Sequence, residues 1–398
     1  MPVSHRIAIV LTAGVSSDAY SWRTERLAIV DAATGRHLPT LTYDPVGPHC
    51  VAWSSDGQRL VVGRNAPWAY DLPLFSVYDA SSLTEEPGWG AVPLNVNARR
   101  VSASATHVAV VTGTKNLSVY DFATKALVHS AVLTGDIYAL AWSPDGARLA
   151  VGTSQVFRVY DTATWSTISG VTSRSWVFAA SFSPDGQYLA VGHGGGSATQ
   201  LDLYDAATWA DIPTGVQVAF PAGAQSVSWR GDSGAVCLGL TKPPHAVVVT
   251  VPGLVPLTVN APAGTSEGED AQVQMLPDGR LAISRSLGVG HRLVSLLAPD
   301  LATIEQDLYP TGRQPMSIAA APWLRNDISG RVLDEASQPA QGRRVLCVHD
   351  ASERVVASAV TAADGTYSLM SPHADGHTVV LIEDDGRAQA LGSGILPL

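Results

Sequence analysis

Two glycine-rich segments carry the residue types of a serine hydrolase. Gly264-Thr265-Ser266-Glu267-Gly268 has the Gly-x-Ser-x-Gly spacing of a nucleophilic serine, and His193-Gly194-Gly195-Gly196 has the form of an oxyanion loop. Such a serine needs a strand before it and a helix after it. Ser266 instead follows Ala261-Pro262-Ala263 and precedes acidic residues, where no helix is predicted. We therefore interpret both segments as loops, and catalysis is the weakest of three hypotheses.

Histidines near the C-terminus could form a metal site if the fold brought them together. The candidates are His349, His373 and His377, with Asp375 as a fourth ligand. A zinc site needs about four ligands in a fixed geometry, whereas Pro372 and Gly376 place this segment in a loop. Acidic clusters also fit no calcium-binding loop; they lie at Glu267, Glu269, Asp270 and 383–385. The sequence therefore predicts no metal and no cofactor.

A third motif, Arg230-Gly231-Asp232, is the tripeptide that integrins bind. It occupies the place that a Ser-Pro-Asp-Gly turn takes elsewhere in this chain. We therefore interpret it as a hairpin turn rather than as an adhesion motif.

Composition excludes several classes of function. The 398 residues carry 25 Lys and Arg against 35 Asp and Glu, a net charge of −10, so the chain lacks the basic surface that a nucleic acid would need. No apolar run reaches the length that spans a membrane, and Ile7 to Leu11 is too short for a signal peptide. The cysteines match no disulfide or metal spacing, which predicts buried free thiols; they are Cys50, Cys237 and Cys347.

One short phrase, Asp-x-x-Thr or Asp-x-x-Ser, recurs six times. The copies begin at Asp31, Asp79, Asp121, Asp161, Asp205 and Asp300, and the first four intervals are 48, 42, 40 and 44 residues. The wide last interval contains a degenerate copy near Val251. A period of this size, built from strand-like runs, is typical of stacked or radially arranged sheets. The Asp and Thr side chains are expected to hydrogen-bond within the turn that follows each strand.

A second phrase precedes each of these turns. Its best copies are Ser143-Pro144-Asp145-Gly146 and Ser183-Pro184-Asp185-Gly186, and Ser54-Ser55-Asp56-Gly57 is similar. Proline presets one turn dihedral and glycine adopts a positive one, so each phrase is expected to close a β-hairpin. Each unit then contains four strands. Six units are predicted to begin near Val51, Val101, Ala139, Ala179, Val227 and Val273.

This pattern resembles the WD-repeat family of β-propellers over residues 5–323. Tyr-Asp stands where that family has Trp-Asp, so its internal hydrogen-bonded tetrad is not assumed here. Strands at Arg6 to Thr12 and Arg26 to Asp31, with Met316 to Trp323 as an inner strand, would form a seventh blade shared by both chain ends. We predict an all-β, seven-bladed propeller over residues 1–325. Recurrent aromatics at one strand position are expected in the core between blades; they are Trp53, Trp142, Phe182, Trp229 and Trp323.

After Trp323 the sequence changes to shorter alternating runs. These predict strands at 328–332, 343–348, 355–361 and 367–369, with a last strand at 378–382. The segment resembles the carboxypeptidase-regulatory-like, transthyretin-like sandwiches appended to tailed-phage virion proteins. Ile328-Ser329-Gly330-x-Val332, Pro339-Ala340 and Asp364-Gly365-x-Tyr367 carry the resemblance. It implies a small β-sandwich at residues 326–398 that serves in docking or adhesion without catalysis.

Exposed aromatic and arginine residues in the loops indicate a binding surface. In a propeller, the loops between second and third strands share a face with the connections that precede the inner strands. Such side chains suit a protein–protein contact, although packing against their own loops is an equal alternative. The predicted binding residues are Tyr20, Trp22, Trp68, Tyr70, Arg99, Arg100, Arg174 and Trp176.

Three hypotheses for function follow. The first is a non-enzymatic structural protein of a phage tail or similar particle, located in the virion, with other virion proteins or a host surface molecule as partners. The second is a bacterial cytoplasmic scaffold that binds peptides or proteins. The third is a propeller hydrolase or lactonase. None of the three involves nucleic acid or insertion into a membrane, and the sequence leaves the oligomeric state open.

Overall fold

The computed structural model describes a chain made of β-strands. The described residues are 6–12, 26–31, 41–42, 48–64, 74–89, 98–168, 176–194, 198–219, 224–240, 245–259, 272–276, 279–286, 292–307, 314–320, 326–332, 338, 340–349, 354–364, 366–371, 377–382 and 388–395. Every regular element among them is a strand. Within these segments there is no helix of the length and apolarity that crossing a membrane requires.

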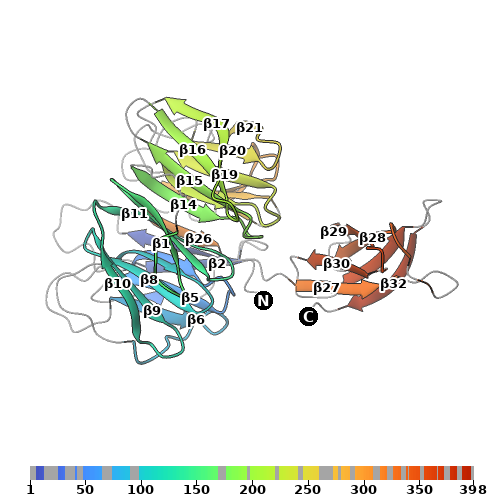
Figure 1. The fold of residues 1–398 in the computed structure, drawn as a ribbon, viewed down its shortest axis with the longest axis horizontal. Coiled ribbons are helices and arrows are strands. Elements are labelled where there is room, and N and C mark those ends of the chain that lie inside the picture. The colour runs from blue at the N-terminus through green and yellow to red at the C-terminus, as the bar shows by residue number, and fades with distance from the viewer. Residues whose placement is uncertain are drawn as a thin grey trace. The chain divides into compact units, whose positions relative to one another are not determined.

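Internal contacts divide the chain into His5–Pro322 and a second unit that holds Trp323–Leu398. The first unit contains seven antiparallel sheets (Figure 1). Strands are named here from the inner to the outer strand of each sheet. One sheet consists of β4 (Pro48–Trp53), β5 (Arg59–Arg64) and β6 (Phe75–Asp79). The next consists of β7 (Ala98–Ala103), β8 (His107–Thr112), β9 (Asn116–Asp121) and β10 (Leu127–Val132), and a third of β11 (Ile137–Trp142), β12 (Arg148–Thr153) and β13 (Phe157–Asp161).

Three further sheets continue the series along the chain. The first consists of β14 (Val177–Phe182), β15 (Tyr188–Gly194), β16 (Ala198–Asp205) and β17 (Asp211–Ala219). The second consists of β18 (Ala224–Trp229), β19 (Ala235–Leu240), β20 (Ala246–Thr250) and β21 (Pro256–Val259). The third consists of β22 (Val273–Met275), β23 (Leu281–Ser286), β24 (Arg292–Leu297) and β25 (Ile304–Asp307). Each sheet is one blade of a propeller. In the blades of β4 and β11, a bridge stands in place of an outer strand; the bridges are Tyr78–Glu85 and Tyr160–Thr167.

The seventh sheet joins the two ends of the first unit. Its order is β26 (Gln314–Ala320), β1 (Arg6–Thr12), β2 (Arg26–Asp31) and β3 (Leu41–Thr42). β26 pairs antiparallel with β1, with Ile7 opposite Ala320 and Ile9 opposite Ile318. Each inner strand contacts the inner strand of the next blade, and β26 contacts both β22 and β4. The ring is therefore closed by both chain ends, which confirms the predicted seven-bladed, all-β propeller and hides sheet edges that would otherwise remain open.

The core of the ring lies between neighbouring blades. The second strand of each blade is an apolar run buried on both faces, such as Leu60 to Val62 and Leu149 to Val151. Three inner strands end on a tryptophan whose indole nitrogen donates to a carbonyl of the preceding blade. Trp53 Nε1 lies 3.1 Å from Ala319 O, Trp142 Nε1 lies 3.1 Å from Ser102 O, and Trp229 Nε1 lies 2.9 Å from Ser181 O. These hydrogen bonds allow a large polar ring to be buried between blades.

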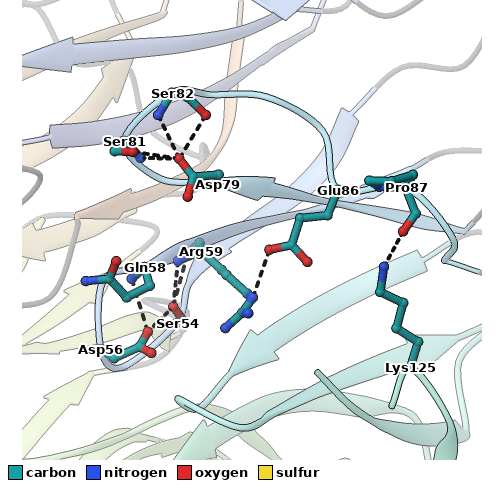
Figure 2. A network of polar contacts seen from close by, with 10 residues as sticks. All are labelled: Ser54, Asp56, Gln58, Arg59, Asp79, Ser81, Ser82, Glu86, Pro87 and Lys125. Carbon is teal, nitrogen blue, oxygen red and sulfur yellow. Dashed lines mark hydrogen bonds and ion pairs between the residues drawn. The ribbon is translucent and has the colours of Figure 1, made fainter. Parts of the chain in front are cut away.

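The Ser-x-Asp-Gly phrases close the predicted hairpins between first and second strands. In the blade of β4, Ser54 Oγ donates to Asp56 Oδ1 at 2.5 Å, and Asp56 Oδ1 also accepts from the Gln58 backbone at 3.1 Å (Figure 2). Gly57 has a φ of 66°, in the left-handed region that favours glycine. The Arg230-Gly231-Asp232 segment forms the same turn, since Ser233 N donates to Arg230 O at 2.9 Å. Its interpretation as a hairpin is confirmed.

The Asp-x-x-Thr phrases form the turns that follow the third strands. Asp121 Oδ1 accepts from the Thr124 backbone at 2.7 Å and from its hydroxyl at 2.8 Å, as predicted. The next residue, Lys125, has a φ of 58° and donates its backbone N–H to Asp121 O at 2.8 Å. The degenerate copy begins at Thr250, where Leu254 N donates to Thr250 O at 2.8 Å. Asp31 is described, but the residues of its turn lie outside the described segments.

Acid titration should reveal the contribution of these turns. Asp79 accepts four hydrogen bonds from Ser81 and Ser82, between 2.7 and 3.1 Å (Figure 2). The backbone N–H of Ser82, followed by the two hydroxyls, lowers the pKa of Asp79 from 3.8 to about 2. Because the folded pKa is the lower one, the stabilisation is present above pH 4 and is lost as the pH falls towards 2. We expect Asp79→Ala to lower the unfolding free energy by roughly 1 kcal/mol at pH 7, allowing for solvent screening.

Urea denaturation of the wild type and Asp79→Ala between pH 7 and pH 2.5 measures this contribution. The difference between the two proteins should shrink steadily below pH 4. A difference that stays constant over this range would show that the charged carboxylate does not stabilise the turn.

The second unit contains two antiparallel sheets. One pairs β27 (Asn326–Arg331) with β30 (Thr366–Ser371); the other has the order β29 (Arg354–Val360), β28 (Arg344–His349), β31 (His377–Ile382) and β32 (Ala388–Ile395). β32 corrects the sequence analysis, which ended the strands at residue 382. It was missed because Ala388–Ile395 contains two glycines and lacks a clear apolar alternation. The sandwich arrangement of these sheets, and the boundary at residue 326, stay predictions.

The structure also corrects where the inner strands begin and end. Five of the predicted starting points lie two or three residues inside the strands that begin at Pro48, Ala98, Ile137, Val177 and Ala224. The closing strand ends at Ala320, and Trp323 lies outside the described residues. The predicted aromatic position is confirmed at the last residue of the other four strands, namely Trp53, Trp142, Phe182 and Trp229.

Candidate functional site

A β-bulge recurs near the beginning of six inner strands. One is at Met316 in β26. In the other five strands, the pairing with the second strand shifts by one residue after the first position. The extra residue has no partner opposite it, so its side chain is redirected out of the regular alternation. We call these five residues the bulge ring; they are His49, Arg99, Tyr138, Phe178 and Gln225.

The bulge ring lies at one end of the propeller. All five residues are the second residue of an inner strand, and the inner strands of neighbouring blades run alongside one another around the ring. None of the five is fully buried: Arg99 is exposed and the other four are half-buried. The residues on either side of each bulge residue are buried, except Arg100, which follows Arg99, and Ser226, which follows Gln225. The fold therefore directs five side chains of different chemistry towards the same accessible rim.

One sector of the rim is cationic. His49 and Arg99 come from the neighbouring inner strands β4 and β7, and Arg100 follows directly in β7. Burial lowers the pKa of His49, and the charges of Arg100 and Arg99 lower it further, so His49 is held neutral beside two arginines. Within the described residues, His49 Nδ1 is buried without a hydrogen-bond partner. A buried polar atom without a partner is costly, and its burial also keeps it from direct contact with a ligand.

The adjacent sector is aromatic. The rings of Tyr138 and Phe178, from neighbouring blades, lie 5.4 Å apart, and the ring of Trp176 lies 6.1 Å from Phe178. Trp176 is 46% exposed although it is fixed at both backbone ends. Its N–H donates to Ser154 O at 3.2 Å and its carbonyl accepts from Gly194 N at 3.1 Å. This side chain is thus an exposed aromatic on a rigid support, which is typical of the residues that dominate protein interfaces.

The structure shows where part of the predicted binding set lies, and the binding role of these residues stays a prediction. Trp176 is an exposed residue immediately before an inner strand, as predicted. Arg99 and Arg100 lie inside β7 rather than in the connection before it, because that strand begins at Ala98. The other predicted residues lie outside the described segments; they are Tyr20, Trp22, Trp68, Tyr70 and Arg174. Of the predicted residues, Arg99 is therefore a member of the bulge ring, and Arg100 and Trp176 lie close to members of it in the sequence.

Sequence reasoning missed His49, Tyr138, Phe178 and Gln225. A usable signal was present, since each stands four residues before the aromatic that ends its strand. Strand alternation alone assigns such a residue to the same face as the aromatic. Nothing in the local residue types indicates the bulge, so the sequence does not distinguish these residues from other strand residues.

The other chemical candidates are only partly described by the structure. His193 lies in β15 and its Nε2 is 2.6 Å from Asp202 on the neighbouring strand, so it is held within the sheet. Ser266 lies outside the described residues.

The predicted metal candidates are also described only in part. The backbone register places His349 opposite His377, whereas His373 and Asp375 are not described. No group of three metal-binding side chains occurs in the described part of the chain. Cys50 and Cys237 are buried free thiols, as predicted, and burial raises the pKa of both.

Comparison with known proteins supports the fold. The family model described as WD domain, G-beta repeat matches residues 127–161 and 166–199, from β10 into β16. Hydrazine synthase of Kuenenia stuttgartiensis is a similar solved structure, with a TM-score of 0.51 and 15% identity over 71% of this chain and 92% of that chain. A chain of a mitotic checkpoint complex has a TM-score of 0.50 and 18% identity over 66% of this chain and 81% of its own. No curated protein matches the sequence. At these identities the two structures establish the fold alone.

Proposed function

We propose that this chain, a seven-bladed β-propeller containing WD40 repeats, is a non-enzymatic platform that binds a protein partner at the bulge ring. The observation that carries the proposal is the recurrence of the bulge in five inner strands, which presents five accessible side chains at one end of the ring. Bulges are common where a side chain is redirected towards a ligand. Rigid support by strands also reduces the entropy lost on binding.

The two sectors of the rim define the chemistry of the partner. The exposed side chain of Arg99 in β7 suits a carboxylate. The rings of Tyr138, Phe178 and Trp176 suit an apolar or aromatic side chain. A partner segment that carries an acidic residue next to an apolar one would match both sectors.

Paired variants with matched controls test the proposal. Arg99→Glu combined with Trp176→Ala changes one exposed residue in each sector, while Arg158→Glu combined with Leu257→Ala makes comparable changes on outer parts of the blades. We expect the rim variant to lose at least tenfold in affinity for a partner captured from the native host, because interface arginine and tryptophan side chains each contribute about 1 kcal/mol or more. The control variant should bind like the wild type.

Equal loss of binding in both variants would contradict the proposal, and so would a rim variant that binds like the wild type. Circular dichroism of all variants provides the check on folding.

A virion setting is the finer form of this proposal. It is supported by the resemblance of residues 326–398 to sandwiches of tailed-phage virion proteins, with other virion proteins or a host surface molecule as partners. Mixing the chain with purified particles and measuring stoichiometric incorporation tests this setting. A chain never found in particles would favour the cytoplasmic scaffold instead.

The absence of catalysis is part of the same proposal. It is supported by the position of His193 within a sheet and by its close pairing with Asp202. A screen with ester and lactone substrates, using Ser266→Ala as the control, tests it. Activity that disappears in Ser266→Ala would overturn it.

A further inference from the structure

The outer strand β10 differs from the outer strands of the other blades. It runs over Leu127–Val132 and pairs with β9 on one side only, so its other edge is free within the described part of the chain (Figure 1). Leu127 is 53% exposed, Val128 41% and Val132 78%. Three large apolar side chains thus lie in the solvent along one free edge.

Free edges are normally protected against pairing by short length, by proline or by charge. The other described outer strands follow this rule. β3 has two residues, β17 contains Asp211 and Pro213, β21 begins with Pro256, and β25 contains Glu305 and Asp307. β10 has six residues and contains neither proline nor a charged Asp, Glu, Lys or Arg. Its one bulge, at Val128, lies near the beginning and leaves the ladder from His129 to Val132 regular.

We infer that β10 is a self-association surface, which pairs antiparallel with β10 of a second copy of this chain. Leu133 N donates to Lys115 O at 2.9 Å, so Ala131 and His129 direct their backbone groups towards β9 by the alternation of an antiparallel ladder. The N–H and C=O groups of Ser130 and Val132 therefore point to the free edge. A second strand would bond to these groups.

Registers with a twofold axis at Ser130, Ala131 or Val132 all satisfy that constraint. The axis at Ser130 pairs the longest stretch of β10 with its copy, because it places Ser130 opposite Ser130 and Val128 opposite Val132 on both sides. The exposed face then reads Val, Ser, Val in both directions, so the strand is complementary to itself. Hydroxyl pairs and pairs of β-branched residues are favourable cross-strand neighbours. Because the strand carries no charge, no like-charge repulsion arises across the axis, and this favours a second copy over a partner selected by charge.

Substitutions at Ser130 test the inference with the full-length chain. Ser130→Pro removes a backbone N–H that points to solvent in the monomer, so the blade should tolerate it while pairing is blocked. Analytical ultracentrifugation should show the wild-type mass rising from 41.6 kDa towards twice that value with concentration, and Ser130→Pro remaining monomeric. Val132→Lys should act like Ser130→Pro.

A cysteine at the axis tests the register. Opposed residues of a hydrogen-bonded pair have Cα atoms about 5.5 Å apart, which is within the range of a disulfide. Ser130→Cys should therefore form a covalent dimer on mild oxidation at least tenfold faster than Val255→Cys, a control on an exposed residue of another blade. A monomeric wild type at all concentrations overturns the inference, even if a different protein proves to bind β10. Equal cross-linking of the two cysteine variants also overturns it.

Discussion

A chain that ends at Arg313 should fail to form a cooperative fold, whereas a chain that ends at Pro322 should keep it. The first truncation removes β26, the inner strand of the closing blade, and so exposes the edge of β1. It also removes Ile318 from the cluster that it forms with Ile7 and Ile9, and the carbonyl of Ala319 that accepts from Trp53. An unclosed ring leaves two blades without one neighbour, so we expect loss of a sharp thermal transition together with aggregation.

The longer truncation is the matched control, because it removes the second unit and leaves His5–Pro322 intact. Thermal denaturation followed by circular dichroism, with size-exclusion chromatography before heating, distinguishes the two chains. A chain ending at Arg313 that melts as sharply as the longer one would show that closure by both chain ends contributes little.

Gly152→Ala should destabilise the protein by about 3 kcal/mol, because the interface between two blades has no room for a methyl group. A Cβ at Gly152 would lie 2.7 Å from Val177 Cβ and 3.1 Å from Ala139 Cβ. The backbone of Gly152 is not left-handed, so conformational entropy alone would predict a gain of about 0.4–1 kcal/mol from the same change. The two effects have opposite signs, which makes the measured direction decisive.

Urea denaturation of Gly152→Ala, Val177→Ala and the double variant completes the test. Val177→Ala removes Val177 Cγ1, which lies closer still to the added methyl group, but keeps Cβ. The double variant should therefore recover part of the stability that Gly152→Ala loses. If the two changes are simply additive, or if Gly152→Ala stabilises the protein, the account of close packing between blades is wrong.

The architecture was predictable because its signals are local and repeated. The Asp-x-x-Thr turns and the Ser-x-Asp-Gly hairpins depend on hydrogen bonds within a few residues, as at Asp121 and Ser54, and each copy reinforces the others. The boundaries of the inner strands were less predictable. Their first residues, such as Pro48 and Ala98, acquire strand conformation from pairing across the blade rather than from their own preferences.

The candidate site was only partly predictable for a related reason. Trp176 could be recognised because it stands in a connection and is large and aromatic. Phe178 and Tyr138 looked like ordinary strand residues, since nothing in their local sequence indicates the bulge at which they lie. Their proximity to one another depends on ring closure, which places neighbouring blades side by side and has no counterpart in sequence distance.

Photo-cross-linking from the rim tests the central claim most directly. A photoreactive phenylalanine analogue would replace Trp176 in one chain and Leu257, which is 53% exposed on an outer strand, in another. In the native host, we predict one dominant protein adduct from the Trp176 position, absent from the Leu257 position and lost when Arg99→Glu is added. Adducts of equal yield from both positions, or from Leu257 alone, would contradict the claim that the bulge ring is where this propeller binds its partner.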